Sequence, residues 1–206
     1  MHCSVKSSST REWLIDAGLK QEAVDESCRQ LSRFVKRESA LRGTASPVGY
    51  MGSGNRRAEV MIVSDSPNES ERNTKLIGFS DYAIVLTVML NKLGIEFDDA
   101  YWTTAIKDED TRINFDKIQE QRKHLQEEVI YVNPSIIISL GTTSITALLN
   151  KKTKFDSVPD DVGYNVHDNL PDIPIISLEH PESYIFDDAF QEKFSESWKK
   201  VKSAFD

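Results

Sequence analysis

The chain alternates between short, continuous apolar runs and longer segments whose apolar residues recur every three or four positions. The short runs are rich in β-branched residues, a pattern typical of parallel strands that are buried on both faces. They predict four strands, at residues 58–63, 101–106, 135–140 and 174–178. The longer segments predict helices at residues 10–35 (divided near Gly18), 82–93, 115–132, 141–149 and 187–205.

Strands that alternate with helices along a chain usually form a parallel sheet with helices on both faces. The sequence therefore predicts an α/β fold, a three-layer α/β/α sandwich around a central four-stranded parallel sheet. Residues 1–9 are polar and Ser-rich, and we expect them to be disordered. Residues 10–206 are expected to form a single domain, with residues 43–55 and 151–173 as irregular connections.

Composition narrows the class of protein. The 206 residues are 39% hydrophobic and 28% charged, as in ordinary globular domains. No apolar run reaches the roughly 18–20 residues that a membrane span needs, and the N-terminus lacks the apolar core of a signal peptide. Cys3 and Cys28 have no metal-ligand spacing, so we expect a cytoplasmic protein with no metal, cofactor or membrane partner. The net charge of −8 argues against binding nucleic acid by bulk charge, although a local basic face is allowed.

Polar side chains follow each of the four predicted strands. They are Asp65 with Ser66, Thr103 with Thr104, Gly141 with Thr142, and His180 with Ser183. Because the carboxyl ends of parallel strands meet at one edge of a sheet, these residues are expected to lie close together. Asp65 could position a water molecule for hydrolysis while His180 polarises a leaving group. Alternatively, both residues could simply cap helices and fix loops by hydrogen bonds.

The motifs around these residues, in their order along the chain, resemble those of the uracil-DNA glycosylase superfamily, most closely its family 4. Residues 58–68 read A-E-V-M-I-V-S-D-S-P-N, where the family has A-x-x-M-x-V-G-E-A-P-G. Residues 101–107 read Y-W-T-T-A-I-K against Y-x-T-N-x-x-K, and residues 134–141 read P-S-I-I-I-S-L-G against P-x-x-I-x-x-L-G. His180 and Pro181 match two positions of the final H-P-S motif. The resemblance covers roughly residues 25–190.

This resemblance implies cleavage of the bond between a base and its sugar in DNA. Asp65 would stabilise the oxocarbenium-like sugar and position water, and His180 would hydrogen-bond the departing base. The residues implied in contact with the flipped base are Ser66, Phe79 and Thr104. Those implied in contact with the DNA strand are Gly141, Thr142, Ser183, Tyr184 and Ile185, with residues 184–186 as a wedge. In the alternative reading, Phe79 belongs to the core and residues 184–186 begin the last helix.

The chain departs from the family pattern at several positions. Ser64 and Asn68 replace motif glycines, Asp65 replaces a glutamate, and Thr104 replaces the asparagine that reads the edge of uracil. The four cysteines that hold an iron–sulfur cluster in family 4 have no counterparts as a set. Cys28 stands near the first, and the residues near the others are Leu31, Asp108 and, by approximate alignment, Arg122. No such cluster is therefore expected.

Three functions remain open. The first is a glycosylase that acts on uracil or a related modified or damaged base in single- or double-stranded DNA. The second is a catalytically inactive DNA-binding protein associated with a polymerase or another replication protein. The third, a nucleotide-binding α/β domain, lacks a Gly-rich phosphate loop after the first predicted strand. The small, cluster-free form would suit a phage or mobile-element gene.

Overall fold

The computed structural model describes residues 7–41, 50–108, 113–158, 163–164 and 172–205. The helices are α1 (Ser7–Asp16), α2 (Gln21–Leu41), α3 (Glu69–Thr74), α4 (Asp81–Asn91), α5 (Phe115–Val132), α6 (Gly141–Leu149) and α7 (Phe190–Phe205). The strands are β1 (Ser53–Gly54), β2 (Val60–Ser64), β3 (Tyr101–Thr104), β4 (Ile136–Leu140), β5 (Gly163–Tyr164) and β6 (Ile173–Leu178). Three short 3-10 helices are η1 (Phe97–Asp99), η2 (Phe155–Ser157) and η3 (Pro181–Ser183).

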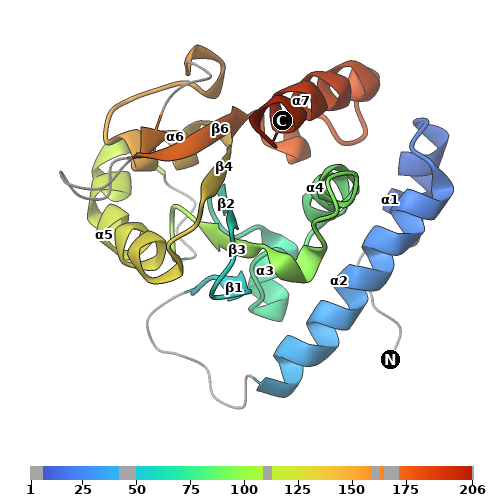
Figure 1. Ribbon diagram of the computed structural model, residues 1–206, viewed down its shortest axis with the longest axis horizontal. Coiled ribbons are helices and arrows are strands. Elements are labelled where there is room, and N and C mark those ends of the chain that lie inside the picture. Colours follow the sequence, from blue (N-terminus) through green and yellow to red (C-terminus); the bar gives the residue numbers. More distant parts are fainter. Residues whose placement is uncertain (1–6, 42–49, 109–112, 159–162, 165–171, 206) are drawn as a thin grey trace.

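The strands form one mixed sheet in the order β1-β3-β2-β4-β6-β5. The four inner strands are parallel, which confirms the predicted four-stranded parallel core. The outer strands β1 and β5 have two residues each and pair antiparallel to β3 and β6. The sequence did not predict them, because two residues are too few to show the alternation that marks a strand. The inner strands cross the centre of the molecule in Figure 1.

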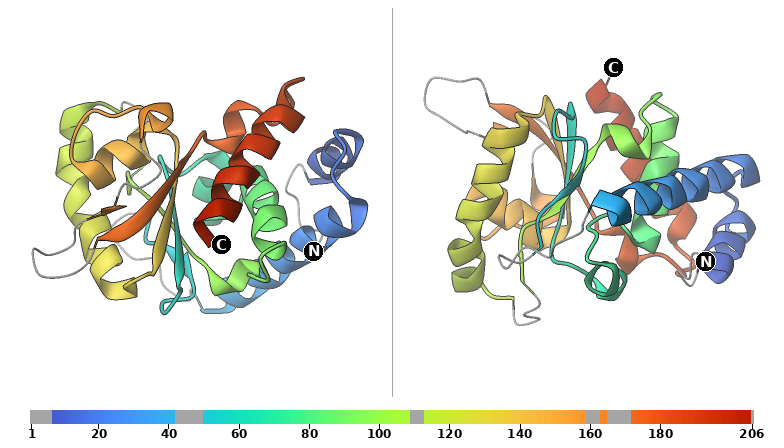
Figure 2. Two further views of the ribbon diagram at one scale, coloured as in Figure 1. Left: turned by 45° about the horizontal axis from the view of Figure 1, so that its top comes forward. Right: turned by 90° about the horizontal axis from the view of Figure 1, so that it is seen from below.

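Helices cover both faces of the sheet, as Figures 1 and 2 show. On one face, α1, α2, α4 and α7 build a large core with Val60 and Ile62 of β2. On the other face, α5 and α6 pack on Met61 and Val63 of the same strand. Alternate residues of a strand point to opposite faces, so one apolar run contributes to both cores. The predicted three-layer sandwich is therefore confirmed.

Helix α4 is enclosed by protein on all sides. Residues 82–90 are buried without interruption, since the helix lies against the sheet and is covered on its outer side by α2. A helix that is apolar all round is expected in such a position. Its N-terminal residues lie beside η3, which places α4 next to the loop after β6.

Two boundaries differ from the sequence prediction. Helix α1 begins at Ser7, three residues before the predicted start, and residues 1–6 lie outside the described residues. Helix α3 occupies a segment predicted as loop. It has only six residues and no apolar face, so the capping box is the one feature of its sequence that indicates a helix. In this box, the side chains of Asn68 and Glu71 each accept a hydrogen bond from the other's backbone N–H. Residues 159–162 and 165–171 of the predicted irregular connection at 151–173 lie outside the described residues, and none of the described helices could cross a membrane.

A buried ion pair ties strand β3 to helix α5. Lys107 and Glu128 are in contact, and each is less than a tenth exposed. The Glu128 carboxylate also accepts hydrogen bonds from the Thr103 hydroxyl (2.5 Å), the Tyr101 hydroxyl (3.2 Å) and the backbone N–H of Gly52 (2.9 Å). Burial lowers the pKa of Lys107, and the negative charge of Glu128 opposes that change. One carboxylate of α5 therefore bonds strand β3 and the residue before β1.

Removal of one partner of this pair should be strongly destabilising. Lys107→Met would leave the Glu128 charge buried without its cation, and we expect a loss of about 3–5 kcal/mol in the free energy of unfolding, measured in urea. Lys123→Met is the matched control, because Lys123 makes an exposed ion pair with Glu127 on the same helix. It should change stability little. Similar losses in the two variants would contradict a structural role for the buried pair.

Candidate active site

The predicted catalytic residues lie at the carboxyl edge of the sheet. Asp65 follows β2 directly, and His180 comes two residues after the end of β6. Strand β4 lies between these two strands. Adjacent strands are about 4.8 Å apart, so the ends of β2 and β6 are separated by about 10 Å. The sheet order therefore brings together two residues that are far apart in the sequence.

The carboxylate of Asp65 caps helix α6. Its Oδ1 accepts a hydrogen bond from the backbone N–H of Ser144 at 2.8 Å. Burial raises the pKa of Asp65 to about 6, and the backbone N–H groups of Ser144 and Thr143 oppose that rise because they stabilise the ionised form. The carboxylate also packs against Gly141, where an added Cβ would lie 2.5 Å from Oδ2. The loop-fixing role considered for Asp65 is thus present in the structure.

This capping bears on the predicted contacts with DNA at the start of α6. The helix N-terminus is the usual place for an anion, and here the Asp65 carboxylate already occupies it. A phosphate at Gly141 would meet a second negative charge, so the structure argues against the predicted phosphate contact there. The next residue, Thr142, is exposed, and its contact with DNA stays a prediction.

His180 is held as a neutral imidazole. Its Nδ1 accepts a hydrogen bond from the backbone N–H of Glu182 at 3.3 Å, which assigns the ring proton to Nε2. Burial lowers the pKa of His180 to about 4. The ring lies edge-on against that of Tyr82, with a centroid distance of 4.8 Å. At neutral pH, His180 can therefore donate a hydrogen bond through Nε2–H without carrying a charge.

Glu71 is a central residue of the site that the sequence analysis did not identify. Its side chain is fully buried. The carboxylate accepts hydrogen bonds from the backbone N–H of Asn68 (2.9 Å), the backbone N–H of Gly78 (2.7 Å) and the Tyr82 hydroxyl (2.8 Å). Burial raises the pKa of Glu71 to about 7, and these three donors oppose that rise. The capping-box spacing of Asn68 and Glu71 was the signal that could have revealed it.

Glu182 connects the two predicted catalytic loops. The Asn68 side-chain amide donates to its carboxylate, which joins the loop after β2 to η3. Burial raises the pKa of Glu182, and the charge of Glu182 adds to the raised pKa values of Asp65 and Glu71. Because the backbone N–H of Glu182 also bonds His180, one residue interacts with both sides of the site. The result is a cluster of three carboxylates beside a neutral histidine.

The predicted base contacts have different outcomes. Thr104 is fully buried, and its hydroxyl donates to the backbone O of Ile106 at 2.7 Å. Since that is its one hydrogen, Thr104 has no donor left for a base, and the structure argues against the predicted role. Phe79 is 5% exposed and belongs to the larger core, as the alternative reading expected. Ser66 is partly exposed directly after Asp65, and its contact with a base stays a prediction.

The predicted wedge is wrong in its first two residues. Tyr184 is 1% exposed and Ile185 is 9% exposed, so both belong to the core and could not enter a DNA stack. Only Phe186, the third residue of the segment, is largely exposed, at 56%. Its backbone has a φ of 70° and its ring lies 4.9 Å from that of Trp13. The sequence pattern alone could not predict which of the residues 184–186 are buried and which are exposed.

Ser183 is exposed, but its hydroxyl already has partners within the chain. The oxygen lies 2.7 Å from both Glu179 Oε1 and the backbone O of His180. The hydroxyl hydrogen is therefore used inside the loop, while its lone pairs are free. A contact between Ser183 and a phosphate, which needs that hydrogen, would have to displace one of these bonds.

The positions that correspond to the cysteine ligands of family 4 do not form a site for an iron–sulfur cluster. Cys28 and Leu31 lie on α2 and pack in the core that includes α4. Arg122 lies on α5, on the other face of the sheet, and donates to the backbone O of Ala147. Asp108 pairs with Lys117 of α5. Within the described part of the chain, no group of three or more His, Cys, Asp or Glu residues could hold a metal ion.

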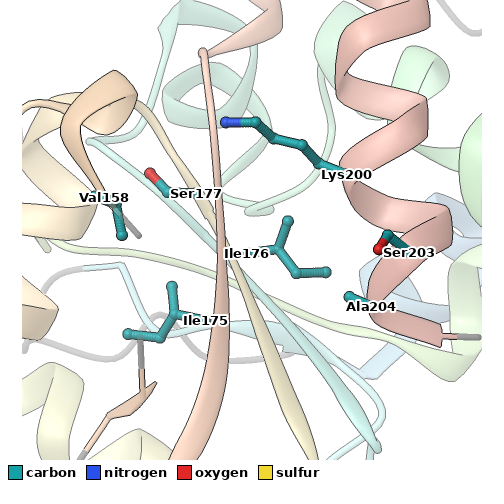
Figure 3. A pocket seen from close by; sticks show the side chains of 7 residues that line it. All are labelled: Val158, Ile175, Ile176, Ser177, Lys200, Ser203 and Ala204. Carbon is teal, nitrogen blue, oxygen red and sulfur yellow. The ribbon is translucent and has the colours of Figure 1, made fainter. Parts of the chain in front are cut away.

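A cavity of about 120 Å³ lies between β6 and α7 (Figure 3). Ile175, Ile176 and Ser177 of β6 line it, together with Lys200 and Ala204 of α7. None of the predicted site residues is among the residues that line this cavity. The polar cluster around Asp65, Glu182 and His180 remains the candidate active site.

Comparison with known proteins identifies relatives over most of the chain. The model of the uracil DNA glycosylase superfamily matches residues 51–202. A type-4 uracil-DNA glycosylase of Saccharolobus solfataricus is 26% identical over 164 residues, which cover 74% of each chain. One of Archaeoglobus fulgidus is 23% identical over 159 residues, covering 73% of this chain and 78% of its own. A DNA polymerase of Bacillus phage SP01 is 28% identical over 117 residues, 55% of this chain but 13% of the polymerase.

The packing of Asp65 on α6 predicts a large effect of a small substitution. In Gly141→Ala, the new methyl group would meet the Asp65 carboxylate at a position whose φ is +88°. Gly94→Ala is the matched control, because Gly94 has a φ of +75° with nothing within 4 Å of an added Cβ. The control should lose about 1–2 kcal/mol in the free energy of unfolding from backbone strain alone, and Gly141→Ala clearly more. Equal losses of stability in the two variants would mean that the Asp65 carboxylate does not restrict the residue at position 141.

Burial of Glu71 predicts a pH-dependent stability. Because the folded state raises the pKa of Glu71 to about 7, it binds a proton more tightly than the unfolded state does. The stability that this proton supplies is complete below about pH 4.5 and is lost as the pH rises through about 7. The difference in unfolding free energy between the wild type and Glu71→Gln should therefore fall by about 3 kcal/mol over this range. Urea unfolding at several pH values measures it, and a constant difference would contradict a buried, titrating Glu71.

Proposed function

The chain belongs to the uracil DNA glycosylase superfamily, and from this premise we propose that it hydrolyses the bond between a base and its deoxyribose in DNA. The observation that carries the proposal is the cluster at the carboxyl edge of the sheet. There the partly buried carboxylate of Asp65 and the neutral imidazole of His180 lie on loops that Glu182 connects. A carboxylate suits stabilisation of a sugar cation, and a neutral hydrogen-bond donor suits stabilisation of a departing base.

Each residue has a separate task in this reaction. As the glycosidic bond breaks, its electron pair moves to the base and the sugar gains oxocarbenium character. Asp65, ionised above pH 6, stabilises that positive charge and accepts a proton from the water that adds to the sugar carbon. His180 donates a hydrogen bond from Nε2–H to the base oxygen that gains negative charge. The low pKa of His180 keeps the ring neutral, so this bond strengthens as the negative charge develops.

The target base belongs to the class of uracil and related modified or damaged bases. Relatives that carry the name type-4 uracil-DNA glycosylase support this class. Thr104 has no free donor for a base carbonyl, so discrimination among such bases should be weaker at that edge than in a site with an amide there. DNA, single- or double-stranded, is the proposed partner.

One observation favours a second function. Part of this chain is similar to 13% of a phage DNA polymerase, so a domain of this kind occurs within a replication enzyme. The capping of α6 by Asp65 also gives this residue a structural task that does not need catalysis. In this alternative, the chain is a catalytically inactive accessory protein that binds DNA beside a polymerase.

Cleavage of modified DNA tests the proposal. Oligonucleotides that carry uracil, hypoxanthine, xanthine or 5-hydroxymethyluracil, single- and double-stranded, are incubated with the protein, and alkali-labile sites are separated on a gel. Asp65→Asn and His180→Asn should each lower the single-turnover rate by about 10²–10³-fold. Asp116→Asn and His124→Asn change the same residue types at exposed positions of α5 and should leave the rate unchanged. Wild-type cleavage that both site variants retain would rule out the assigned roles.

The pH dependence of the rate separates the two catalytic residues. Because the pKa of Asp65 is raised to about 6, the rate should fall about tenfold per pH unit below that value as the carboxylate becomes protonated. His180 should not contribute above about pH 4, since it is already neutral. A rate that increases as the pH falls below 6 would contradict this mechanism. No cleavage of any substrate, with stable binding to a replication polymerase, would favour the accessory function.

A further inference from the structure

Tyr82 lies beneath the candidate active site and contacts His180. It is the second residue of α4 and is 1% exposed. Its ring meets the His180 ring edge-on, at an interplanar angle of 66°. Its hydroxyl donates to Glu71 Oε1 at 2.8 Å and lies 3.5 Å from Ser64 Oγ at the end of β2. Neither the catalytic proposal nor the family motifs of the sequence assign a role to this tyrosine.

The Glu71 carboxylate that holds Tyr82 is itself fixed from two directions. The backbone N–H of Asn68 bonds one oxygen, and the backbone N–H of Gly78 bonds the oxygen that also accepts the Tyr82 hydroxyl. Burial raises the pKa of Tyr82 well above its ordinary value, so its hydroxyl keeps its proton and remains a donor. The Tyr82 ring therefore has one orientation, which the loop after β2 and the turn before α4 determine.

We propose that Tyr82, tethered by Glu71, is a positioning residue that orients the His180 imidazole and shields one side of it from water. This inference rests on the proposed function, because it assigns His180 the task of hydrogen-bonding the departing base. Tyr82 and Glu71 are fully buried and act through His180 without touching the substrate. With Nδ1 bonded to the Glu182 N–H and the ring packed on Tyr82, Nε2–H is the one donor left to the imidazole.

Several titratable groups surround His180 and could affect its pKa. Tyr82 packs against it from α4 and Glu182 bonds it from η3, while the charge of Glu182 also acts on Asp65 and Glu71. Negative charges would favour a protonated histidine, yet the pKa of His180 is lowered by burial. Burial of the imidazole, to which the Tyr82 ring contributes, therefore keeps His180 neutral. Removal of that ring should let water reach the imidazole.

The test compares three variants of the full-length chain. Tyr82→Phe keeps the ring and removes its bond to Glu71, and Tyr82→Leu removes the ring. Tyr101→Phe is the matched control, because the Tyr101 hydroxyl also bonds a buried carboxylate, that of Glu128, in the core on the other face of the sheet. The tautomer and pKa of His180 are measured by ¹⁵N NMR, with its signals assigned from their loss in His180→Asn.

We expect the pKa of His180 to rise by about 1–2 units in Tyr82→Leu, toward the ordinary value of about 6.5, and by a smaller amount in Tyr82→Phe. Tyr101→Phe should leave it unchanged. On a DNA substrate that the wild type cleaves, Tyr82→Phe should lower the single-turnover rate about tenfold with unchanged DNA affinity. A purely structural tyrosine would leave the His180 titration of the folded variants as in the wild type.

The two readouts separate this inference from the proposed function. If His180 titrates alike in the wild type and in Tyr82→Phe and Tyr82→Leu, the positioning role is overturned, whatever the DNA assay shows. Because Tyr82→Phe retains the buried ring, it keeps the test decisive if Tyr82→Leu does not fold. A shifted His180 titration together with no DNA cleavage by the wild type would support the positioning of His180 and count against the glycosylase function.

Discussion

The site depends on one buried carboxylate, that of Glu71, and on the three donors that it satisfies. A fully buried glutamate is costly unless hydrogen bonds compensate it. Here those bonds come from three different places: the loop after β2, the turn at Gly78, and Tyr82 of α4. None of these segments could move without leaving the carboxylate or a backbone N–H unpaired. The loop that carries Asp65 and the helix that supports His180 are thus fixed relative to each other by the same group.

Asp65 has a structural role in the fold beside the catalytic role proposed for it. Its bond to the Ser144 N–H replaces the cap that α6 lacks in its own sequence, where the residue before the helix is Leu140. The close approach to Gly141 leaves no room for a side chain there, so a glycine at the first position of α6 follows from the presence of the carboxylate. The same contact keeps Asp65 in place at the end of β2, where a reacting sugar would need it. The structural role of Asp65 is therefore compatible with the proposed catalytic one.

The strands, the layers and the helix α5 could be predicted because each depends on local apolar periodicity over many residues, and the predicted bounds of α5 agree with the structure. The site was predictable only in part. Asp65 and His180 follow buried strands, and the order of parallel strands brings such residues together. Glu71, by contrast, looks like an ordinary charged residue of a polar loop, and its burial arises from Gly78 and Tyr82, which come later in the chain. Tyr184 and Ile185 could not be assigned to the core, because the short segment before α7 has no periodicity from which burial can be read.

The acidic cluster raises the question of how such a site could accept DNA. Asp65, Glu71 and Glu182 would carry three negative charges if all were ionised, which would repel the phosphates beside a flipped base. Their pKa values are all raised, chiefly by burial, with that of Asp65 at about 6 and that of Glu71 at about 7. Near neutral pH the Glu71 carboxyl is thus partly protonated, and its charge is smaller than the formal count suggests. The phosphates of an approaching strand would raise the pKa of the buried Glu71 carboxyl further, whereas the backbone N–H groups of Ser144 and Thr143 favour the ionised form of Asp65. A more protonated Glu71 beside an ionised Asp65 would lower the repulsion on the strand and leave the carboxylate that the proposed reaction needs.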